Sequence, residues 1–195
     1  ETAAAEEYRL VRDALARLAM SVHVLGGNHD DRDALREWFP LADGETAGAT
    51  AAGAEYRYVT DIAGTRLVVC DSTIPLRPEG RLDLAWLEAQ LDAPRVVVAM
   101  HHPPFPVGMP ALDEIALGAQ DRAALAALLQ RSPLVLRVIC GHTHRAAFTT
   151  IGGCGVFTCP GVHLTARLEI GAPDYTMAAE PPGFALHVMV DGAVT

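Results

Sequence analysis

The stretch "RVVVAMHHPP" (residues 95–104) joins an apolar run of strand length to two histidines and two prolines. A short, β-branched apolar run is typical of a strand that is buried on both faces of a sheet. The run leads directly into His101 and His102. The stretch therefore predicts a buried strand with imidazoles at its carboxyl end.

Two other apolar runs, one on each side of this stretch in the sequence, end in the same way. "SVHVLG" (residues 21–26) leads into "GNHD", and "PLVLRVIC" (residues 133–140) leads into "GHTH". Ligand sites in open α/β sheets gather beyond the carboxyl ends of the strands. We therefore expect one cleft to be lined by the polar residues of all three strand ends, namely Asn28, His29, His101, His102, His142 and His144.

Each of these clusters also has a structural interpretation. "NHDD" is a common helix cap, "HHPP" could form a rigid turn, and a single histidine is more often a satisfied polar group than a ligand. Together, however, the three strand ends hold five of the eight histidines, which favours a metal site. Imidazole and amide oxygen ligands suit Zn, Mn, Fe or Co. His163 could also line the cleft, whereas we assign His23 and His187 to strands.

The remaining sequence alternates helical and strand patterns. Apolar spacing predicts helices over residues 4–19, 30–39, 81–93 and 121–132, with Asp30 or Asp31 capping the second. Residues 54–72 predict a hairpin, and the tail from residue 145 predicts three or four strands. Residues 103–120 predict a long loop that covers the cleft, where Met109, Asp113 and Glu114 could touch substrate. The pattern favours one α/β domain with mixed sheets.

Composition excludes several classes of protein. The formal net charge of -9 argues against binding to nucleic acid polymers and to anionic membrane surfaces. No apolar run approaches the ~20 residues that a membrane helix needs, and no signal peptide is visible. The four cysteines, Cys70, Cys140, Cys154 and Cys159, are interpreted as reduced, and we expect a cytoplasmic location.

The ordered motifs "GNHD", "HHPP" and "GHTH" resemble those of the calcineurin-like metallophosphoesterases. "CDSTIPLRPEGRLDLAWLEAQL" (residues 70–91) and "EPPGFALHVMVDG" (residues 180–192) are similar to the class III cyclic-nucleotide phosphodiesterase and glycerophosphodiesterase branch. The resemblance implies a four-layer α-β-β-α sandwich with mixed β-sheets. It also implies hydrolysis of cyclic nucleotides such as cAMP, or of small phosphodiesters, with two divalent metal ions.

The resemblance also implies roles for single residues. Asn28, His101 and His142 would bind the second metal, and His144 the first. A hydroxide shared by the two metals would attack phosphorus. His29 would be the catalytic histidine that protonates the leaving group, and Asp30 would orient it. His102 would pack or contact substrate.

The chain departs from the family pattern at two motifs. Neither an Asp-x-His nor a Gly-Asp sequence, which supply the remaining metal ligands, occurs in it. We therefore expect residues 1–195 to form a single, N-terminally incomplete metallophosphoesterase domain that lacks its first βαβ unit and alone holds at most one metal well. The alternative is a non-catalytic or mononuclear metal-binding fragment of such an enzyme, with glycerophosphodiester or phosphomonoester hydrolysis as the runner-up activity of the parent.

The expected partner is a small phosphodiester substrate, and a homodimer is one assembly that the resemblance allows. Few cations lie near the motifs. Arg32 and Arg145 are the nearest, and either could meet a phosphate. We slightly favour their assignment as solvated surface charges.

Overall fold

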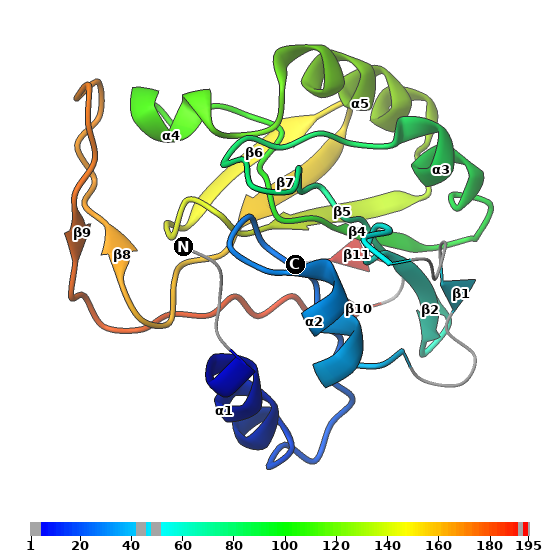
Figure 1. Cartoon of the computed structure of the whole chain (residues 1–195). Coiled ribbons are helices and arrows are strands. Elements are labelled where there is room, and N and C mark those ends of the chain that lie inside the picture. Colours follow the sequence, from blue (N-terminus) through cyan, green and yellow to red (C-terminus); the bar gives the residue numbers. More distant parts are fainter. Residues whose placement is uncertain (1–4, 42–45, 48–51, 191–192, 195) are drawn as a thin grey trace.

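The computed structural model describes residues 5–41, 46–47, 52–190 and 193–194. Its centre is a seven-stranded mixed sheet with the order β1-β2-β3-β4-β5-β7-β6 (Figure 1). The strands β3, β4, β5 and β7 are parallel to one another, and the remaining pairings are antiparallel. The bounds are β1 Thr46–Ala47, β2 Tyr58–Ile62, β3 Thr65–Val69, β4 Val96–Ala99, β5 Val135–Cys140, β6 Ala147–Ile151 and β7 Cys154–Thr158.

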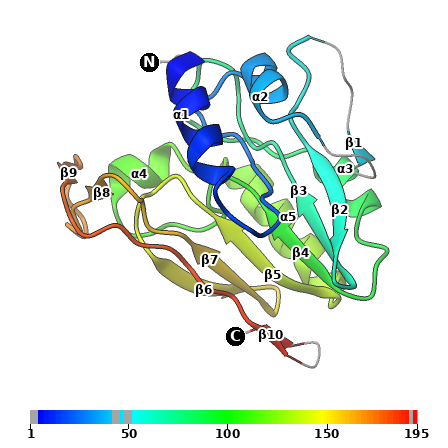
Figure 2. The same cartoon turned by 90° about the horizontal axis from the view of Figure 1, so that it is seen from below.

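Helices cover both faces of this sheet. On one face, α3 (Leu84–Ala89) and α5 (Ala119–Arg131) pack on the side chains of β3, β4 and β5. On the other face lie α1 (Ala5–Leu15) and α2 (Arg32–Trp38) (Figures 1 and 2). The apolar residues of β4 (Val96–Ala99) contribute to the core on both faces of the sheet, because successive side chains of a strand point to opposite faces. Val98 belongs to the first core and Ala99 to the second.

The α/β class and the mixed sheet are therefore confirmed. All four predicted helices are present, although most are shorter than expected. Asp31 is the N-cap of α2 and accepts hydrogen bonds from the backbone N–H groups of Asp33 and Ala34. The predicted hairpin is β2 and β3, and its turn residues Ala63 and Gly64 both have positive φ, as a type I′ turn requires.

The predicted strand over residues 21–26 is wrong. This segment has no regular secondary structure, and no strand within the described part of the chain pairs with it. Alternating apolar residues favour an extended segment, but a strand also needs a neighbour to complete its hydrogen bonds. His23 and His187, which were assigned to strands, also lie outside them.

The loop prediction for residues 103–120 is partly wrong. It contains the short helix α4 (Pro110–Glu114), and α5 begins before its end. Pro110 occupies the first turn of α4, where its missing N–H costs nothing, and Leu112 packs against Met109 and Ala166.

The tail is β-rich, as predicted, with more strands than expected. Beyond β6 and β7 it forms two two-stranded sheets. One consists of β8 (Thr165–Ala166) and β9 (Met177–Ala178), and the other of β10 (Met189–Val190) and β11 (Ala193–Val194).

The parallel strands determine where the polar clusters lie. The chain leaves the carboxyl ends of β3, β4 and β5 at the same edge of the sheet. These ends carry the pairs Asp71–Ser72, His101–His102 and Gly141–His142. The first pair was hidden inside the predicted hairpin, so the edge holds one more polar cluster than the sequence predicted.

Two further expectations concern the environment of the chain. All four cysteines are free, and three of them are buried. Within the described residues, none of the helices combines the length and the apolar character that a membrane span requires.

Candidate metal centre

Three ligand atoms from three distant segments meet at the carboxyl edge of the sheet. Asn28 Oδ1 lies 2.9 Å from His101 Nε2 and 3.3 Å from His142 Nδ1. The two imidazole nitrogens are 3.1 Å apart. We call Asn28, His101 and His142 the metal triad.

The spacing of the metal triad fits a cation. Three ligands at ~2.0–2.1 Å from one ion would lie ~2.9–3.4 Å from each other in tetrahedral or octahedral geometry. The chemistry fits as well, because an amide oxygen and a neutral imidazole nitrogen both offer lone pairs. A cation at the centre would satisfy all three atoms at once.

Burial keeps the imidazoles in the form that binds metal. Desolvation is the largest cause that lowers the pKa of His101 well below its usual value. It also lowers the pKa of His142, to about 3, and the neighbouring His102 acts in the same direction. Both rings are therefore neutral at physiological pH, and protons do not compete with a cation for their nitrogens.

The backbone around the metal triad is strained and closely packed. His142 and His144 have φ values of +69° and +52°, which L residues rarely adopt. A Cβ at Gly27 would lie 2.8 Å from Cε1 of His101, so the loop can approach the ring only without a side chain. Such strain persists where the surrounding structure holds the residue in place, and it often occurs at functional sites.

The turn before α2 carries the predicted catalytic residues. His29 is exposed beside the metal triad, and the Asp30 carboxylate accepts a 2.7 Å hydrogen bond from the backbone N–H of Gly27. The Tyr8 hydroxyl also hydrogen-bonds to the Asp30 carboxylate and accepts from the backbone N–H of Asp31 at 2.8 Å. Burial raises the pKa of Tyr8 to about 12, so the hydroxyl keeps its proton. The predicted contact between Asp30 and His29 stays a prediction.

Tyr8 lies in the helix predicted over residues 4–19, and the sequence did not mark it as a residue of the site. Its side chain is 4% exposed, and it ties α1 to the turn that carries His29. The only signal in the sequence was a buried tyrosine, whose hydroxyl usually finds a partner.

His144 and His163 differ in their relation to the site. His144 lines the same cavity as the metal triad, and its Nδ1 lies 2.8 Å from the carbonyl oxygen of Leu164. A role for His144 toward a second cation stays a prediction. His163 is not among the residues that line this cavity.

His102 is completely buried beside the metal triad. Its Nδ1 lies 2.9 Å from Ser72 Oγ, and its Nε2 lies 3.1 Å from the carbonyl oxygen of Pro78. Its ring nitrogen comes within 4.8 Å of those of His101 and His142, but both of its nitrogens already have partners. We therefore assign it to packing, one of the two roles that the resemblance implied.

The segment that was expected to cover the cleft contributes apolar residues to it. Leu112 and Ile115 line the cavity, whereas Met109 is the buried N-cap residue of α4. Asp113 accepts hydrogen bonds from the backbone N–H groups of Val107 and Gly108, which indicates a structural role.

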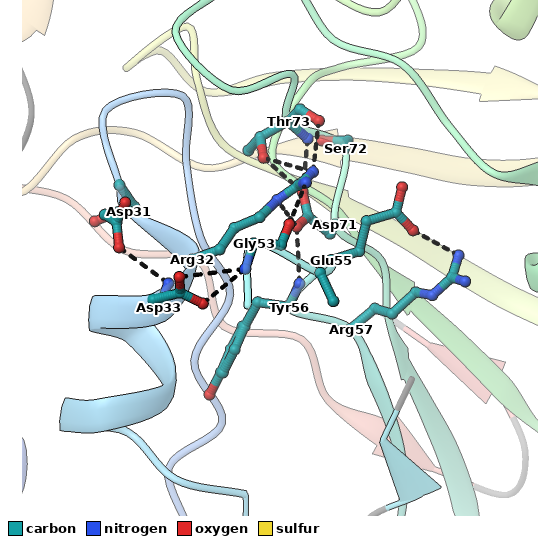
Figure 3. Close-up of polar contacts among 12 residues, drawn as sticks. Asp31, Arg32, Asp33, Gly53, Glu55, Tyr56, Arg57, Asp71, Ser72 and Thr73 are labelled. Carbon is teal, nitrogen blue, oxygen red and sulfur yellow. Dashed lines mark hydrogen bonds and ion pairs between the residues drawn. The ribbon is translucent and has the colours of Figure 1, made fainter. Parts of the chain in front are cut away.

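The assignment of Arg32 and Arg145 as solvated surface charges is wrong. Arg32 is only 11% exposed and pairs with Asp71 at 2.8 Å (Figure 3). Arg145 pairs with Glu180 at 2.6 Å and also donates to the carbonyl oxygen of Ala166. The guanidinium groups of both arginines are therefore engaged in structural contacts.

Two cavities meet at His29. The first, of about 400 Å³, is lined by the metal triad and also by Tyr175 and Met177. The second, of about 370 Å³, lies between residues 28–33 and residues 73–78. Both are lined by residues 28–30 and by Pro78.

Comparisons with known proteins show a family and several relatives to which the chain is similar. Residues 4–146 match the family model described as calcineurin-like phosphoesterase. The chain is 35% identical over 195 residues to glycerophosphodiester phosphodiesterase GpdQ of Enterobacter lignolyticus, covering 95% of this chain and 67% of the relative. It is 31% identical over 169 residues to a cAMP/cGMP dual specificity phosphodiesterase of Mycobacterium tuberculosis, covering 84% of this chain and 50% of the relative.

A solved structure supports the fold. A dimetal phosphatase from Danio rerio superposes with a TM-score of 0.53 at 20% identity, covering 80% of this chain and 68% of that one.

Proposed function

Because the chain belongs to the calcineurin-like phosphoesterase family, whose members use divalent metals, we propose that Asn28, His101 and His142 hold a divalent cation in a phosphodiesterase site. The single observation that carries this proposal is the mutual spacing of the three ligand atoms, 2.9–3.3 Å. The phosphodiesterase names of its relatives support hydrolysis of phosphodiester bonds.

The bound cation would supply Lewis acidity to a phosphate oxygen and acidity to a bound water. The protein would supply the rest. His29 is exposed at the mouth of the site, where in its protonated form it can donate to the departing alkoxide. Asp30 is fixed by Gly27 and Tyr8, so it holds the turn that carries His29. Leu112 and Ile115 cover the cavity with apolar surface and limit the access of water.

A second cation is part of the proposal. His144 is the residue of this chain that would contribute to it, and carboxylates outside these 195 residues would complete the pair. The relatives are longer than the chain, which leaves room for such ligands. Mn, Fe, Zn and Co all suit a mixed imidazole and oxygen ligand set.

The substrate proposed is a small phosphodiester, since two relatives are named for glycerophosphodiesters and for cAMP and cGMP. The free cysteines favour a reducing compartment, so we propose the cytoplasm as the location. Residues 1–195 are proposed to form one domain of the enzyme.

The test measures metal content and phosphodiester hydrolysis of the full-length protein and of three variants. We expect His142→Ala and Asn28→Ala each to lower metal affinity by more than about tenfold and to reduce hydrolysis in parallel. His187→Ala is the matched control, because His187 packs on Phe157 away from the metal triad, and it should change neither. Unchanged metal content in both metal-triad variants would exclude the site. Full metal content without hydrolysis in the unmodified protein would instead indicate a non-catalytic metal-binding protein.

A further inference from the structure

The hydroxyl of Ser72 joins the end of β3 to the histidines that follow β4. Ser72 is completely buried, and its Oγ accepts hydrogen bonds from the backbone N–H groups of His101 at 3.2 Å and of His102 at 3.0 Å. Nδ1 of His102 lies 2.9 Å from the same oxygen. A hydroxyl can accept two hydrogen bonds and donate one, so these three contacts use its full capacity.

We propose that Ser72 is a positioning residue, which holds the main chain of His101 so that its imidazole faces the other two members of the metal triad. This inference rests on the proposed function and adds to it a residue that would not itself touch the cation.

Ser72 continues the hydrogen bonding between β3 and β4 beyond the last backbone bond. That bond runs from the N–H of Cys70 to the carbonyl oxygen of Ala99, at 2.8 Å. The N–H groups of His101 and His102 then bond to a side chain of the segment after β3. Successive N–H groups in a parallel sheet point toward opposite neighbouring strands, so two that bond to one atom mark the residues where the chain turns out of the sheet.

The main chain of His101 is also held from the side of β5. Its carbonyl oxygen accepts a hydrogen bond from the N–H of Gly141 at 3.0 Å, and Gly141 directly precedes His142. The N–H and the carbonyl of His101 are therefore both fixed by the neighbouring segments. Supporting contacts of this kind keep a ligand in its productive geometry, here with Nε2 of His101 3.1 Å from Nδ1 of His142.

Ser72 is itself held in place by the residues on either side of it. The buried carboxylate of Asp71 pairs with Arg32 at 2.8 Å and accepts from the backbone N–H of Tyr56 at 2.8 Å (Figure 3). It also accepts from the backbone N–H of Thr73 at 2.9 Å. The hydroxyl of Ser72 therefore stands on a fixed main chain, as a support for a ligand must.

The test uses Co(II) alone as a probe in the full-length protein, because the visible absorption spectrum of this ion depends on its coordination geometry. We expect Ser72→Ala to lower the affinity for Co(II) by about tenfold and to change the spectrum of the bound ion. A change in the spectrum reports on the arrangement of the ligands, which a loss of stability alone would leave unaltered.

Leu129→Ala is the matched control. Leu129 is also buried, and it lies in α5 beside Gly152, in the turn before β7. The amino ends of the parallel strands lie there, at the edge of the sheet opposite to the metal triad. Leu129→Ala should destabilise the core but keep both the affinity for Co(II) and the spectrum.

Amide hydrogen exchange of the metal-free protein is a second measurement, and its first part needs no variant. In the wild-type protein, the N–H groups of His101 and His102 should exchange about as slowly as that of Val98, which is paired within β4. In Ser72→Ala both should exchange at least about tenfold faster relative to Val98. In Leu129→Ala their rates relative to Val98 should stay as in the wild type.

The possible failures are distinguishable. If the wild-type protein takes up no Co(II), the proposed function fails, and a role of Ser72 toward a cation fails with it. If Co(II) binds but Ser72→Ala and Leu129→Ala have the same affinity and an unchanged spectrum, Ser72 serves the fold alone and only the positioning role is wrong. If Ser72→Ala does not fold, the wild-type exchange rates decide, and rapid exchange at His101 and His102 would overturn the proposal.

Discussion

At the scale of the residue, the site depends on imidazoles that stay neutral because they are buried. The pKa of His142 lies near 3 in the folded chain, far below the usual value of 6.5. Between these two values the unfolded chain binds a proton at this residue and the folded chain does not. Acid therefore favours unfolding of the metal-free protein.

We expect the free energy of unfolding of the metal-free protein to fall as the pH drops from 6.5 toward 4.5. Each such imidazole contributes at most about 1.4 kcal/mol per pH unit. Chemical denaturation at several pH values measures the slope, and His142→Asn should flatten it. His163→Asn alters an exposed histidine and should leave the slope unchanged. An identical slope in both variants would contradict the burial of His142.

The buried ion pair of Arg32 and Asp71 gives a second prediction. Asp71 is 4% exposed, so Asp71→Ala leaves a buried cation without its partner. The variant should lose about 3–5 kcal/mol of unfolding free energy. In the exposed pair of Arg131 and Glu88, Arg131→Ala should cost less than about 1 kcal/mol. Similar losses in the two variants, measured by urea denaturation, would show that Asp71 does not hold a buried charge.

At the scale of the element, the hairpin of β2 and β3 has one unfavourable residue. Ala63 has a φ of +48° at the first turn position, where Asn is better tolerated. Ala63→Asn should stabilise the protein by about 1 kcal/mol, and Gly64→Ala, at a φ of +77°, should destabilise it by a similar amount. Thermal unfolding of both variants checks the signs, and a loss of stability in Ala63→Asn would contradict the turn.

The elements also explain which parts of the fold were predictable. Strand β4 and the hairpin of β2 and β3 could be predicted, because the local sequence pattern and the tertiary structure agree there. Residues 21–26 have the apolar alternation of a strand, yet pairing depends on a neighbour that local sequence does not specify. Helix α4 was missed because prolines and a glycine near it suggested a loop.

The candidate site was likewise predictable only in part. The convergence of His101 and His142 followed from two predicted strand ends, since parallel strands deliver their carboxyl ends to one edge. Asn28 joins them although the segment before it forms no strand. The contributions of Tyr8 and Asp71 could not be predicted, because each side chain contacts a residue far away in the sequence, which no local motif records.

At the scale of the whole molecule, metal binding should stabilise the fold. A ligand that binds only the folded chain adds about 2.7 kcal/mol at a hundred times its dissociation constant. For a chain of this size that corresponds to an increase in Tm of about 5–10 °C. Differential scanning calorimetry with and without metal measures it, and a chelator should reverse it. The increase should disappear in His142→Ala and persist in His187→Ala, and an increase in both would place the metal elsewhere.

The distance along the chain between the members of the metal triad has a further consequence. Asn28 and His142 are 114 residues apart in sequence, and His101 lies between them. A shared cation would link these residues and close two long loops of the chain. In the chain-entropy model, a covalent link that closes a loop of such length is worth about 4–5 kcal/mol. The concentration of free metal would then set how long the chain resists mechanical or proteolytic opening, so that a cell short of metal would lose the protein as well as its activity.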